Sequence, residues 1–409
     1  MTAAQHLYVI PTNREAGASI ASLLDEIKIA FAQGKLSPDQ LVLVVLDSGN
    51  EHDFAVNHDQ LLHSLAGSAI KAYHVTADDF DQLLRQAVDP DVVDLVVGEE
   101  FSYGKMVNKI SIMANLLGTR YVHRRDSDVY LQADRSVTPL LAELEGFAID
   151  DKVKLVGSSY IGAWGIDYSD VEDDQETLRK LFSLSKPNYT TAQLDDYINN
   201  KYVEGSKETF TGKLTFSEKK ANYIDAGNFA LKDIFLNVPV SPANVTSGTD
   251  YLYHNALGKS DWKMLYHNDR VIHRYNKDRY DRINHILYGD SKLLSRLMTT
   301  VTKRALQDQT LSDDFAVMSQ QLADAYVAAL KSDNLNDDLK DTFAKFVVVY
   351  AAIPHENYQA VAQHVAQHED EYLAKTVRDV QNFVTLLRKW PDVMAETKKI
   401  SLQEFEING

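Results

Sequence analysis

The chain has 409 residues, of which 44% are hydrophobic, and it carries a formal net charge of −17 at pH 7. This length and composition predict a folded protein with a substantial core and two or three domains. The negative charge argues against a nucleic-acid or anionic-membrane partner, since both favour basic surfaces, and the absence of cysteine excludes disulfides, cysteine nucleophiles and cysteine metal sites.

The N-terminal residues give no sign of a targeting segment. They lack the basic-then-apolar layout of a secretory signal, and no apolar run in the chain is long enough to span a bilayer. We therefore expect a protein without a transmembrane segment that resides in the cytoplasm.

The beginning of the chain alternates between predicted strands and predicted helices. The predicted strands are residues 6–10, 41–46, 73–75 and 94–98. The predicted helices between them are residues 20–31 and 79–87. Such alternation indicates a parallel α/β sheet. No Gly-x-Gly-x-x-Gly occurs, so the usual dinucleotide-binding fold lacks its phosphate loop.

Polar residues follow the first two predicted strands. Thr12 and Arg14 lie in the loop after the first strand, and Asp47 ends the second strand just before a Ser-Gly-Asn sequence. An acid in this position is well placed to accept a hydrogen bond from a base or ribose. An ordinary turn explains Asp-Ser-Gly-Asn equally well.

Residues 103–131 form the stretch around which the rest of the chain is organised. Apolar residues at helical spacing predict a helix over residues 106–117 that stops at Gly118. Lys105 and Lys109 accompany this apolar pattern. The predicted helix leads directly into the next strand.

That strand, predicted over residues 119–125, delivers Asp126 and Asp128 to its C-terminal end. Ligands collect at the carboxyl ends of strands in open α/β sheets, and two such carboxylates can share a divalent cation. The same Asp-x-Asp pattern also occurs in solvated turns and helix caps. Arg124 or Arg125 pairs either with a phosphate or with a structural acid.

The middle of the chain offers strands, an acidic run and a Gly-Asn sequence. Residues 154–159 and 161–166 predict strands. Residues 167–205 begin with an acidic run and read either as solvated surface or as an inserted lid. Gly227 and Asn228 permit a close approach of a ligand to the backbone, and a hairpin turn explains them nearly as well.

A predicted helix and two histidines follow. Asp250 lies in the first turn of a capped helix over residues 247–257, where the helix dipole favours a carboxylate. His267 and His273 bracket a predicted strand pair that turns at residues 268–269. A neutral imidazole can complete a Mn²⁺ coordination sphere begun by two carboxylates.

The C-terminal part of the chain is poor in glycine and has helical periodicity. The predicted helices are residues 291–308, 312–331, 336–352, 356–388 and 391–397. They predict an all-helical domain at residues 281–409 that packs on the sheet, covers an edge or makes a homodimer contact.

The order of these motifs resembles that of the GT-A glycosyltransferases over roughly residues 5–275. The resemblance implies an α/β catalytic domain at residues 1–280, with a mostly parallel central sheet flanked by helices, followed by the helical domain. It also implies that residues 167–205 are an insertion or an acceptor-side lid. In this family the Asp-x-Asp sequence holds Mn²⁺ or Mg²⁺ on the diphosphate of a sugar nucleotide.

The resemblance also assigns residues to the donor. Thr12, Arg14 and Asp47 match the positions that hold the nucleoside, and Lys105 or Lys109 approaches the diphosphate. Asp126 and Asp128 bind the metal and thereby the donor. The third metal ligand is His273, with His267 as the second choice.

Other residues match the acceptor side of the family. Gly227 and Asn228 correspond to a segment beside the donor sugar and the acceptor. Asp250 corresponds to the general base of inverting enzymes, which deprotonates the acceptor hydroxyl. The family's usual acidic neighbour is Thr249 here, so the resemblance leaves the stereochemistry open, and in a retaining enzyme Asp250 orients the acceptor instead.

The resemblance thus implies a metal-dependent glycosyltransferase that moves a sugar from a nucleotide diphosphate sugar, with UDP-sugars favoured, to an unidentified hydroxyl-bearing acceptor. One alternative is a sugar-1-phosphate nucleotidyltransferase, although its glycine-rich loop with arginine is missing after the first strand. Another alternative is a non-catalytic carbohydrate-binding or scaffold protein.

Overall fold

The structure is a computed structural model that describes residues 4–98, 102–132, 136–162, 174–207, 209–218, 224–245, 250–274 and 284–407. All structural statements below refer to these residues.

In the described part of the chain, nine strands form one mixed sheet with the order β12-β3-β2-β1-β4-β9-β6-β10-β8. Its strands are β1 (His6–Thr12), β2 (Leu41–Asp47), β3 (Lys71–Thr76), β4 (Tyr121–Arg125), β6 (Val153–Gly157), β8 (Phe216–Ser217), β9 (Asn228–Lys232), β10 (Lys263–His267) and β12 (Glu406–Ile407). β3, β2, β1 and β4 pair in parallel, and β9 runs antiparallel between β4 and β6.

A smaller sheet, also counted over the described residues, lies beside the first. Its three strands, in spatial order, are β5 (Val129–Tyr130), β11 (Val271–His273) and β7 (Tyr160–Gly162). This sheet begins directly after β4, so it lies beside the predicted Asp-x-Asp sequence.

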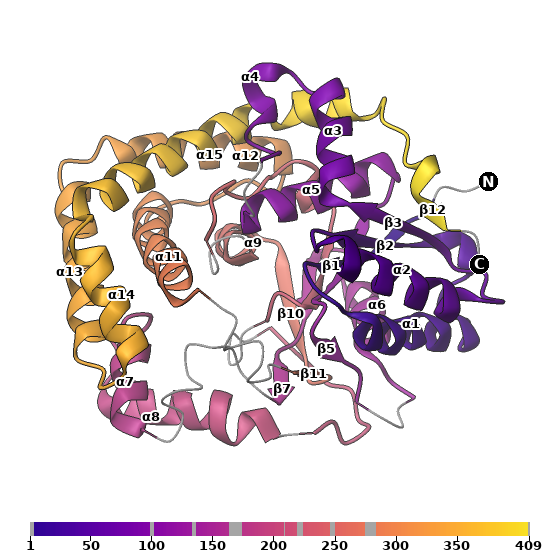
Figure 1. Ribbon diagram of the computed structural model, residues 1–409, viewed down its shortest axis with the longest axis horizontal. Coiled ribbons are helices and arrows are strands. Elements are labelled where there is room, and N and C mark those ends of the chain that lie inside the picture. Colours follow the sequence, from indigo (N-terminus) through magenta and orange to yellow (C-terminus); the bar gives the residue numbers. More distant parts are fainter. Residues whose placement is uncertain are drawn as a thin grey trace.

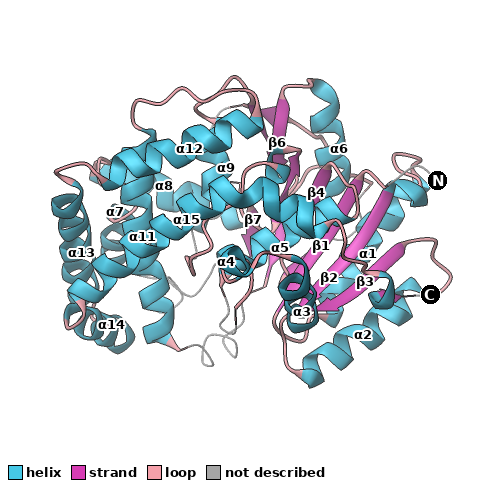
Figure 2. Ribbon diagram, turned by 90° about the horizontal axis from the view of Figure 1, so that it is seen from above, coloured by secondary structure: helices cyan, strands magenta, loops and turns pink. Residues whose placement is uncertain are grey.

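Helices cover both faces of the parallel strands, as Figure 2 shows. One face is covered by α1 (Gly17–Ala32), α2 (Glu51–Leu65) and α6 (Pro139–Ile149). The other face is covered by α3 (Ala77–Ala87) and α5 (Tyr103–Leu116). Tyr8 and Ile10 of β1 join the core on the α1 face. Leu7 and Val9 join the core on the α5 face, as expected when successive strand residues point to opposite sides.

The connections place a crevice at one edge of this sheet. The chain passes from β1 to β2 and β3 on one side, and then returns to place β4 on the other side of β1. Ligands bind outside the carboxyl ends of strands at such a reversal of strand order. The ends of β1 and β4 therefore mark the expected site.

Five helices make up the described C-terminal region, and they follow the chain in orange and yellow in Figure 1. They are α11 (His285–Leu306), α12 (Phe315–Leu330), α13 (Leu335–Ala351), α14 (Glu356–Ala366) and α15 (Glu369–Thr397). One apolar core runs from the sheet into these helices, and α15 packs against α3 and α5. The predicted fold class, a mostly parallel α/β sheet flanked by helices with a helical C-terminal region, is confirmed. None of the helices in the described ranges is long and apolar enough to cross a membrane.

Three details differ from the expectations. Residues 94–98 form no strand, because Asp89 caps and Pro90 begins the short helix α4 (Pro90–Val93), and the apolar residues that follow pack into the core from a turn. β10 and β11 do not form a hairpin, since they belong to different sheets. α15 runs through Pro391, and the break between helices lies near residue 367 instead.

The predicted domain division at residue 280 falls among residues outside the described ranges and stays a prediction. The last strand, β12, does not belong to a separate helical unit, because it pairs antiparallel with β3 at the edge of the large sheet (Figure 1). Part of the predicted lid, residues 167–173, is also outside the description. The described part holds α7 (Gln175–Ser183) and α8 (Thr191–Ile198), and α7 contacts α13.

A buried ionic cluster joins β1 and β4 to the helices on the α1 face. The Arg125 guanidinium lies between Glu143, with N–O distances of 2.8 and 3.1 Å, and Glu26, with distances of 3.1 and 3.2 Å. Tyr8 donates its hydroxyl to Glu26 at 2.5 Å, and His123 Nδ1 lies 2.7 Å from Glu143. Arg125 is fully buried, so it pairs with structural acids rather than with a phosphate.

Two groups in this cluster have displaced pKa values. Burial raises the pKa of the Glu143 carboxyl to about 7, against the opposing effect of Arg125. Burial lowers the pKa of the His123 imidazole to about 3, and Arg125 contributes to that shift. Burial therefore favours the protonated form of Glu143 and the unprotonated form of His123.

The two shifts have opposite effects on stability. Glu143 contributes stability that is fully present below pH 4.5 and is lost as the pH rises through about 7. His123 contributes stability that is present above pH 6.5 and is lost as the pH falls toward about 3. Between pH 4.5 and 6.5, Glu143 makes the unfolding free energy fall as the pH rises, whereas His123 makes it rise.

We expect Glu143→Gln to make the unfolding free energy fall more steeply on acidification. The substitution removes the contribution of Glu143, which offsets that of His123 in this pH range. The free energy of unfolding, measured by chemical denaturation between pH 4.5 and 6.5, should fall on acidification by about 1.4 kcal/mol per pH unit more than in the unmodified protein. Glu145→Gln on the same helix is the control, since Glu145 is half exposed. Parallel pH profiles for Glu143→Gln and the unmodified protein would contradict the prediction.

Candidate functional site

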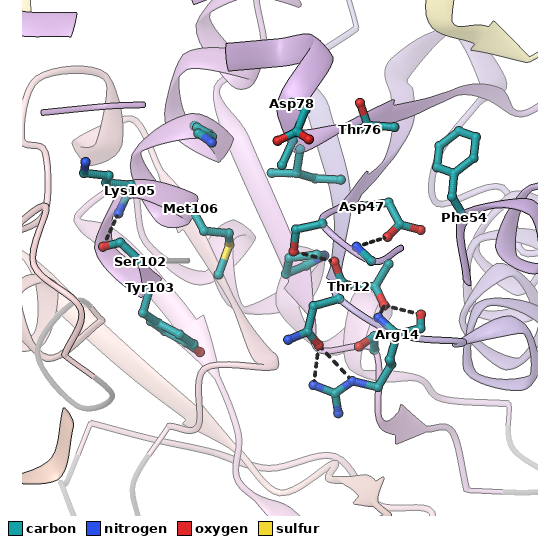
Figure 3. Close-up of a pocket in the computed structure, with 18 of the residues that line it drawn as sticks. Thr12, Arg14, Asp47, Phe54, Thr76, Asp78, Ser102, Tyr103, Lys105 and Met106 are labelled. Carbon is teal, nitrogen blue, oxygen red and sulfur yellow. Dashed lines mark hydrogen bonds between the residues drawn. The ribbon is translucent and has the colours of Figure 1, made fainter. Parts of the chain in front are cut away.

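A cavity of about 930 Å³ opens at the carboxyl ends of β1, β2, β3 and β4. Figure 3 shows side chains of α5 on one side of it and those of the loops after β1 and β2 on the other. Its lining includes Thr12, Asn13, Arg14, Asp47, Phe54, Thr76, Asp78, Tyr103, Lys105, Lys109, Arg124, Asp126, Asp128 and His273. Most of the predicted donor-side residues therefore lie around one opening.

The loop after β1 holds Arg14 at this opening. Thr12 donates its hydroxyl to the Arg14 carbonyl at 2.9 Å and accepts from the Arg14 amide at 3.3 Å, which fixes a tight turn. The guanidinium donates to Asn13 Oδ1 from Nη2 at 2.7 Å and from Nε at 3.0 Å. Its third nitrogen lies 3.3 Å from Asp128 Oδ2, so Arg14 reaches across from β1 to the residues after β4.

Asp47 anchors the loop after β2. Its carboxylate accepts hydrogen bonds from the Gly49 amide at 2.7 Å and from Asn57 at 2.8 Å, and it lies 3.3 Å from His74 Nε2. The residue is almost fully buried, although it contributes to the lining. Its predicted contact with a nucleoside stays a prediction, and its clearest observed role is to shape the loop.

Phe54 is a lining residue that the sequence reasoning missed. Its ring stacks on His74 with centroids 4.0 Å apart and an angle of 11° between the planes. Figure 3 shows it on the same side of the cavity as Asp47. The sequence indicated Phe54 only by its position, one turn after Asn50, the residue that caps α2. An aromatic residue in the first turns of a helix does not by itself indicate a binding site.

The two lysines of α5 lie on one face of the helix, one turn apart. Lys105 Nζ donates to the Val97 carbonyl at 2.6 Å, and burial lowers the pKa of its ammonium group. Lys109 forms an ion pair with Asp81. Both side chains line the cavity, but their strongest contacts tie α5 to α3 and to the segment before α5. Their predicted approach to a diphosphate stays a prediction.

The predicted Asp-x-Asp residues both line the cavity just after β4. Asp126 accepts from Arg124 Nη2 at 2.9 Å through one oxygen and from the Tyr160 hydroxyl at 2.8 Å through the other. Asp128 Oδ2 lies 3.3 Å from Arg14 and 3.5 Å from His273 Nε2. Each carboxylate is thus matched with one arginine.

The structure separates the two candidate histidines. His273 lies on β11, lines the cavity and stacks on Tyr160 with centroids 4.8 Å apart and planes 6° apart. His267 ends β10, is fully buried and takes no part in the lining. His273 Nε2 lies 3.5 Å from Asp128 Oδ2, so His273 is the better placed of the two beside the Asp-x-Asp residues.

Tyr160 joins several of these residues, and the sequence did not single it out. Its hydroxyl accepts from the Gly227 amide at 2.6 Å and donates to Asp126, while its ring supports His273. Burial raises the pKa of this hydroxyl well above its ordinary value, so it remains a proton donor at neutral pH. Tyrosines are common in strands, and only the pairing of β7 with β11 brings this one to the site.

Gly227 and Asn228 differ in their relation to the cavity. A Cβ at Gly227 would lie 2.6 Å from two carbons of Asp126 and 2.5 Å from the Tyr160 hydroxyl, so glycine is needed for close packing. Asn228 is fully buried and donates to the carbonyls of Ser159 and Asp269 at 3.4 Å. The amide therefore holds backbone segments together, and its predicted place beside a sugar stays a prediction.

Asp250 is the first residue of α9 (Asp250–Leu257), but its side chain lies outside the description, as do residues 246–249 before it. Its predicted role as a general base therefore stays a prediction.

Charge is unevenly distributed in the cavity lining. Seven described lining residues are acidic: Asp47, Glu51, Asp78, Asp79, Asp81, Asp126 and Asp128. Four are basic: Arg14, Lys105, Lys109 and Arg124. Within the described ranges, no group of three or more histidine, aspartate or glutamate side chains is arranged to hold a metal ion. The predicted metal site at Asp126, Asp128 and His273 therefore stays a prediction.

The structure is that of an α/β protein with a cavity at the carboxyl ends of its parallel strands. The chain is similar to two solved glycosyltransferase structures. One is the mannosyltransferase PcManGT from Pyrobaculum calidifontis in complex with GDP-Man and Mn²⁺, at 13% identity and a TM-score of 0.39 over 94% of this chain and 87% of that one. The other is glucosyl-3-phosphoglycerate synthase from Mycobacterium tuberculosis in complex with Mn²⁺, UDP-glucose and phosphoglyceric acid, at 16% identity and a TM-score of 0.38 over 72% and 79%.

The chain belongs to DUF6271, a family of unknown function, whose model matches residues 6–406. No curated protein matches it. Both TM-scores above describe a loose likeness of overall fold.

We expect Gly227→Ala to destabilise the protein, because the added methyl group overlaps Asp126 and Tyr160. The loss in unfolding free energy should be about 1–3 kcal/mol, as is typical of overpacking, and it can be measured by chemical denaturation. Gly17→Ala is a matched control, since its nearest neighbour is the flexible side chain of Gln60 at 3.2 Å. Equal stability of the Gly227→Ala protein and the control would show that the site tolerates the methyl group.

Proposed function

We propose that this protein is a metal-dependent glycosyltransferase that takes a sugar from a nucleoside diphosphate sugar, with UDP-sugars as the first candidates. The observation that carries the proposal is the convergence of Asp126, Asp128, His273 and two arginines on one cavity at the carboxyl ends of β1 and β4. A volume of about 930 Å³ is ample for such a donor.

The chemistry of the donor atoms, rather than their present arrangement, supports a Mn²⁺ or Mg²⁺ ion. Asp126 and Asp128 offer carboxylate oxygens, and His273 offers an imidazole nitrogen, which are ligands that Mn²⁺ accepts. Asp128 Oδ2 and His273 Nε2 already lie 3.5 Å apart. The acidic excess of the lining also favours a cation. When bound, such an ion neutralises charge on the departing nucleotide.

The remaining lining residues bind and orient the donor in this proposal. The turn between Thr12 and Arg14, the loop held by Asp47 and the ring of Phe54 surround the nucleoside. The first residues of α2, α3 and α5 line the cavity, so three helix N-termini face it, and their dipoles favour phosphate groups.

The acceptor side follows from the expected role of α9. Asp250 would deprotonate the acceptor hydroxyl in an inverting enzyme, or orient the acceptor in a retaining one. Gly227, which packs on Asp126, would border the sugar. A cytoplasmic location, a lid within residues 167–205 and a homodimer contact through the C-terminal helices are further predictions.

We expect nucleotide binding to require both the metal and the paired aspartates. Calorimetry with UDP should detect binding in the presence of Mn²⁺ but not with a chelator, and Asp126→Asn with Asp128→Asn should weaken it by roughly 100-fold or more, since outer-shell changes alone cost about 10–100-fold. Asp151→Asn is the control, because Asp151 is fully exposed. Metal-independent binding with full affinity in the double variant would count against the proposal.

A panel of sugar nucleotides then distinguishes the reaction from its rivals. A glycosyltransferase should hydrolyse its own donor slowly to a nucleoside diphosphate and free sugar without any acceptor. A sugar-1-phosphate nucleotidyltransferase should instead release a nucleoside triphosphate when pyrophosphate is added. A carbohydrate-binding protein should do neither.

A further inference from the structure

Each carboxylate of the Asp126 and Asp128 pair has an arginine beside it. Arg124 Nη2 lies 2.9 Å from Asp126, and Arg14 Nη1 lies 3.3 Å from Asp128. Arg14 comes from the loop after β1 and Arg124 from β4, and both line the cavity. The site is therefore electrically compensated in the structure, although it is built from acids.

This compensation has a physical reason. The side chains of Asp126 and Asp128 are only 24% and 12% exposed, and a carboxylate that is largely removed from water needs a partner charge. A divalent cation would supply that charge instead. The arginines would then face a cation rather than the acids, and a diphosphate is the group that could accept them.

Resting on the proposed function, we propose that Arg14 and Arg124 act as exchangeable counterions. They neutralise Asp128 and Asp126 while the cavity lacks a donor, and they transfer to the phosphate oxygens of a nucleoside diphosphate when the two carboxylates bind a divalent cation. Metal and nucleotide then bind cooperatively. The metal releases the arginines for the phosphates, and the phosphates draw the arginines away from the carboxylates that bind the metal.

The surroundings of both arginines suit this exchange. The Arg14 side chain is about one-third exposed, while its backbone is fixed by Thr12, so the guanidinium can move without the loop. The Arg124 side chain is only 2% exposed, but unlike Arg125 it lines the cavity, and it contacts Tyr103 with a hydrogen bond of 2.5 Å and a ring centroid 5.1 Å away. Tyr103 begins α5 at the cavity, so it can support the guanidinium in either position.

Among the described residues, the other basic side chains of the lining, and Arg125 behind it, are bound to groups that a metal would not replace. Lys109 is paired with Asp81, Lys105 donates to the Val97 carbonyl, and Arg125 lies between two buried glutamates. Arg14 and Arg124 thus differ from them in being paired with the carboxylates that bind the metal in the proposed function.

The test measures Mn²⁺ and UDP binding separately, by the electron paramagnetic resonance signal of free Mn²⁺ and by calorimetry. In Arg14→Met, Mn²⁺ alone should bind roughly three- to five-fold more tightly, because the competing cation is gone. UDP with Mn²⁺ should bind about ten-fold or more weakly, because a charge-assisted hydrogen bond to phosphate is lost. The two affinities therefore change in opposite directions.

Arg124→Met should show the same pattern, provided that its thermal unfolding remains cooperative; if it does not fold, Arg14→Met alone decides. Arg120→Met is the matched control, since Arg120 forms an exposed pair with Asp233 at the opposite end of β4, and neither affinity should change.

The outcomes separate this inference from the proposed function. If the unmodified protein binds no UDP in the presence of Mn²⁺, the proposed function fails. If it does bind, but Arg14→Met weakens both ligands or changes neither, Arg14 has a merely structural or peripheral role and the exchange is wrong.

Discussion

Strand β4 carries two consecutive arginines, and the geometry of a strand sends them to opposite faces of the sheet. Arg125 points to the face of the sheet that α1 and α6 cover, where Glu26 of α1 and Glu143 of α6 surround it. Arg124 points to the cavity, where it meets Asp126. The buried cluster fixes the register of β4 against α1 and α6, and this register determines where the acids after β4 emerge. The candidate site thus depends on a salt bridge network on the other side of the sheet.

The sequence predicted the central part of this arrangement well. The apolar spacing of α5, its stop at Gly118 and the strand that ends before Asp126 are local features, so they can be read from neighbouring residues. The alternative roles of Arg124 and Arg125 could not be separated from the sequence. The partners of Arg125 lie 18 and 99 residues away, and those of Arg124 lie two and 21 residues away.

The misses have a common cause, since each depended on contacts between distant segments. The apolar run at residues 94–98 looks like a strand, but it follows α4 as a turn and its apolar side chains are buried against other parts of the core. β10 and β11 are close in sequence, yet β10 pairs within the large sheet and β11 within the small one. Tyr160 acquired its contacts only because β7 pairs with β11. Pro391 is tolerated within α15, where its neighbour Trp390 is fully buried and donates to the Phe235 carbonyl at 3.3 Å.

The pairing of β12 with β3 has a consequence for how the protein is made. β3 leaves the ribosome early, but residues 406–407, which cover its outer edge, are synthesised more than three hundred residues later. During that interval the unsatisfied amides and carbonyls of β3 are open to pairing with another nascent chain. The exposed Lys71 at the start of β3 is a charge of the kind that discourages such pairing until β12 has been synthesised.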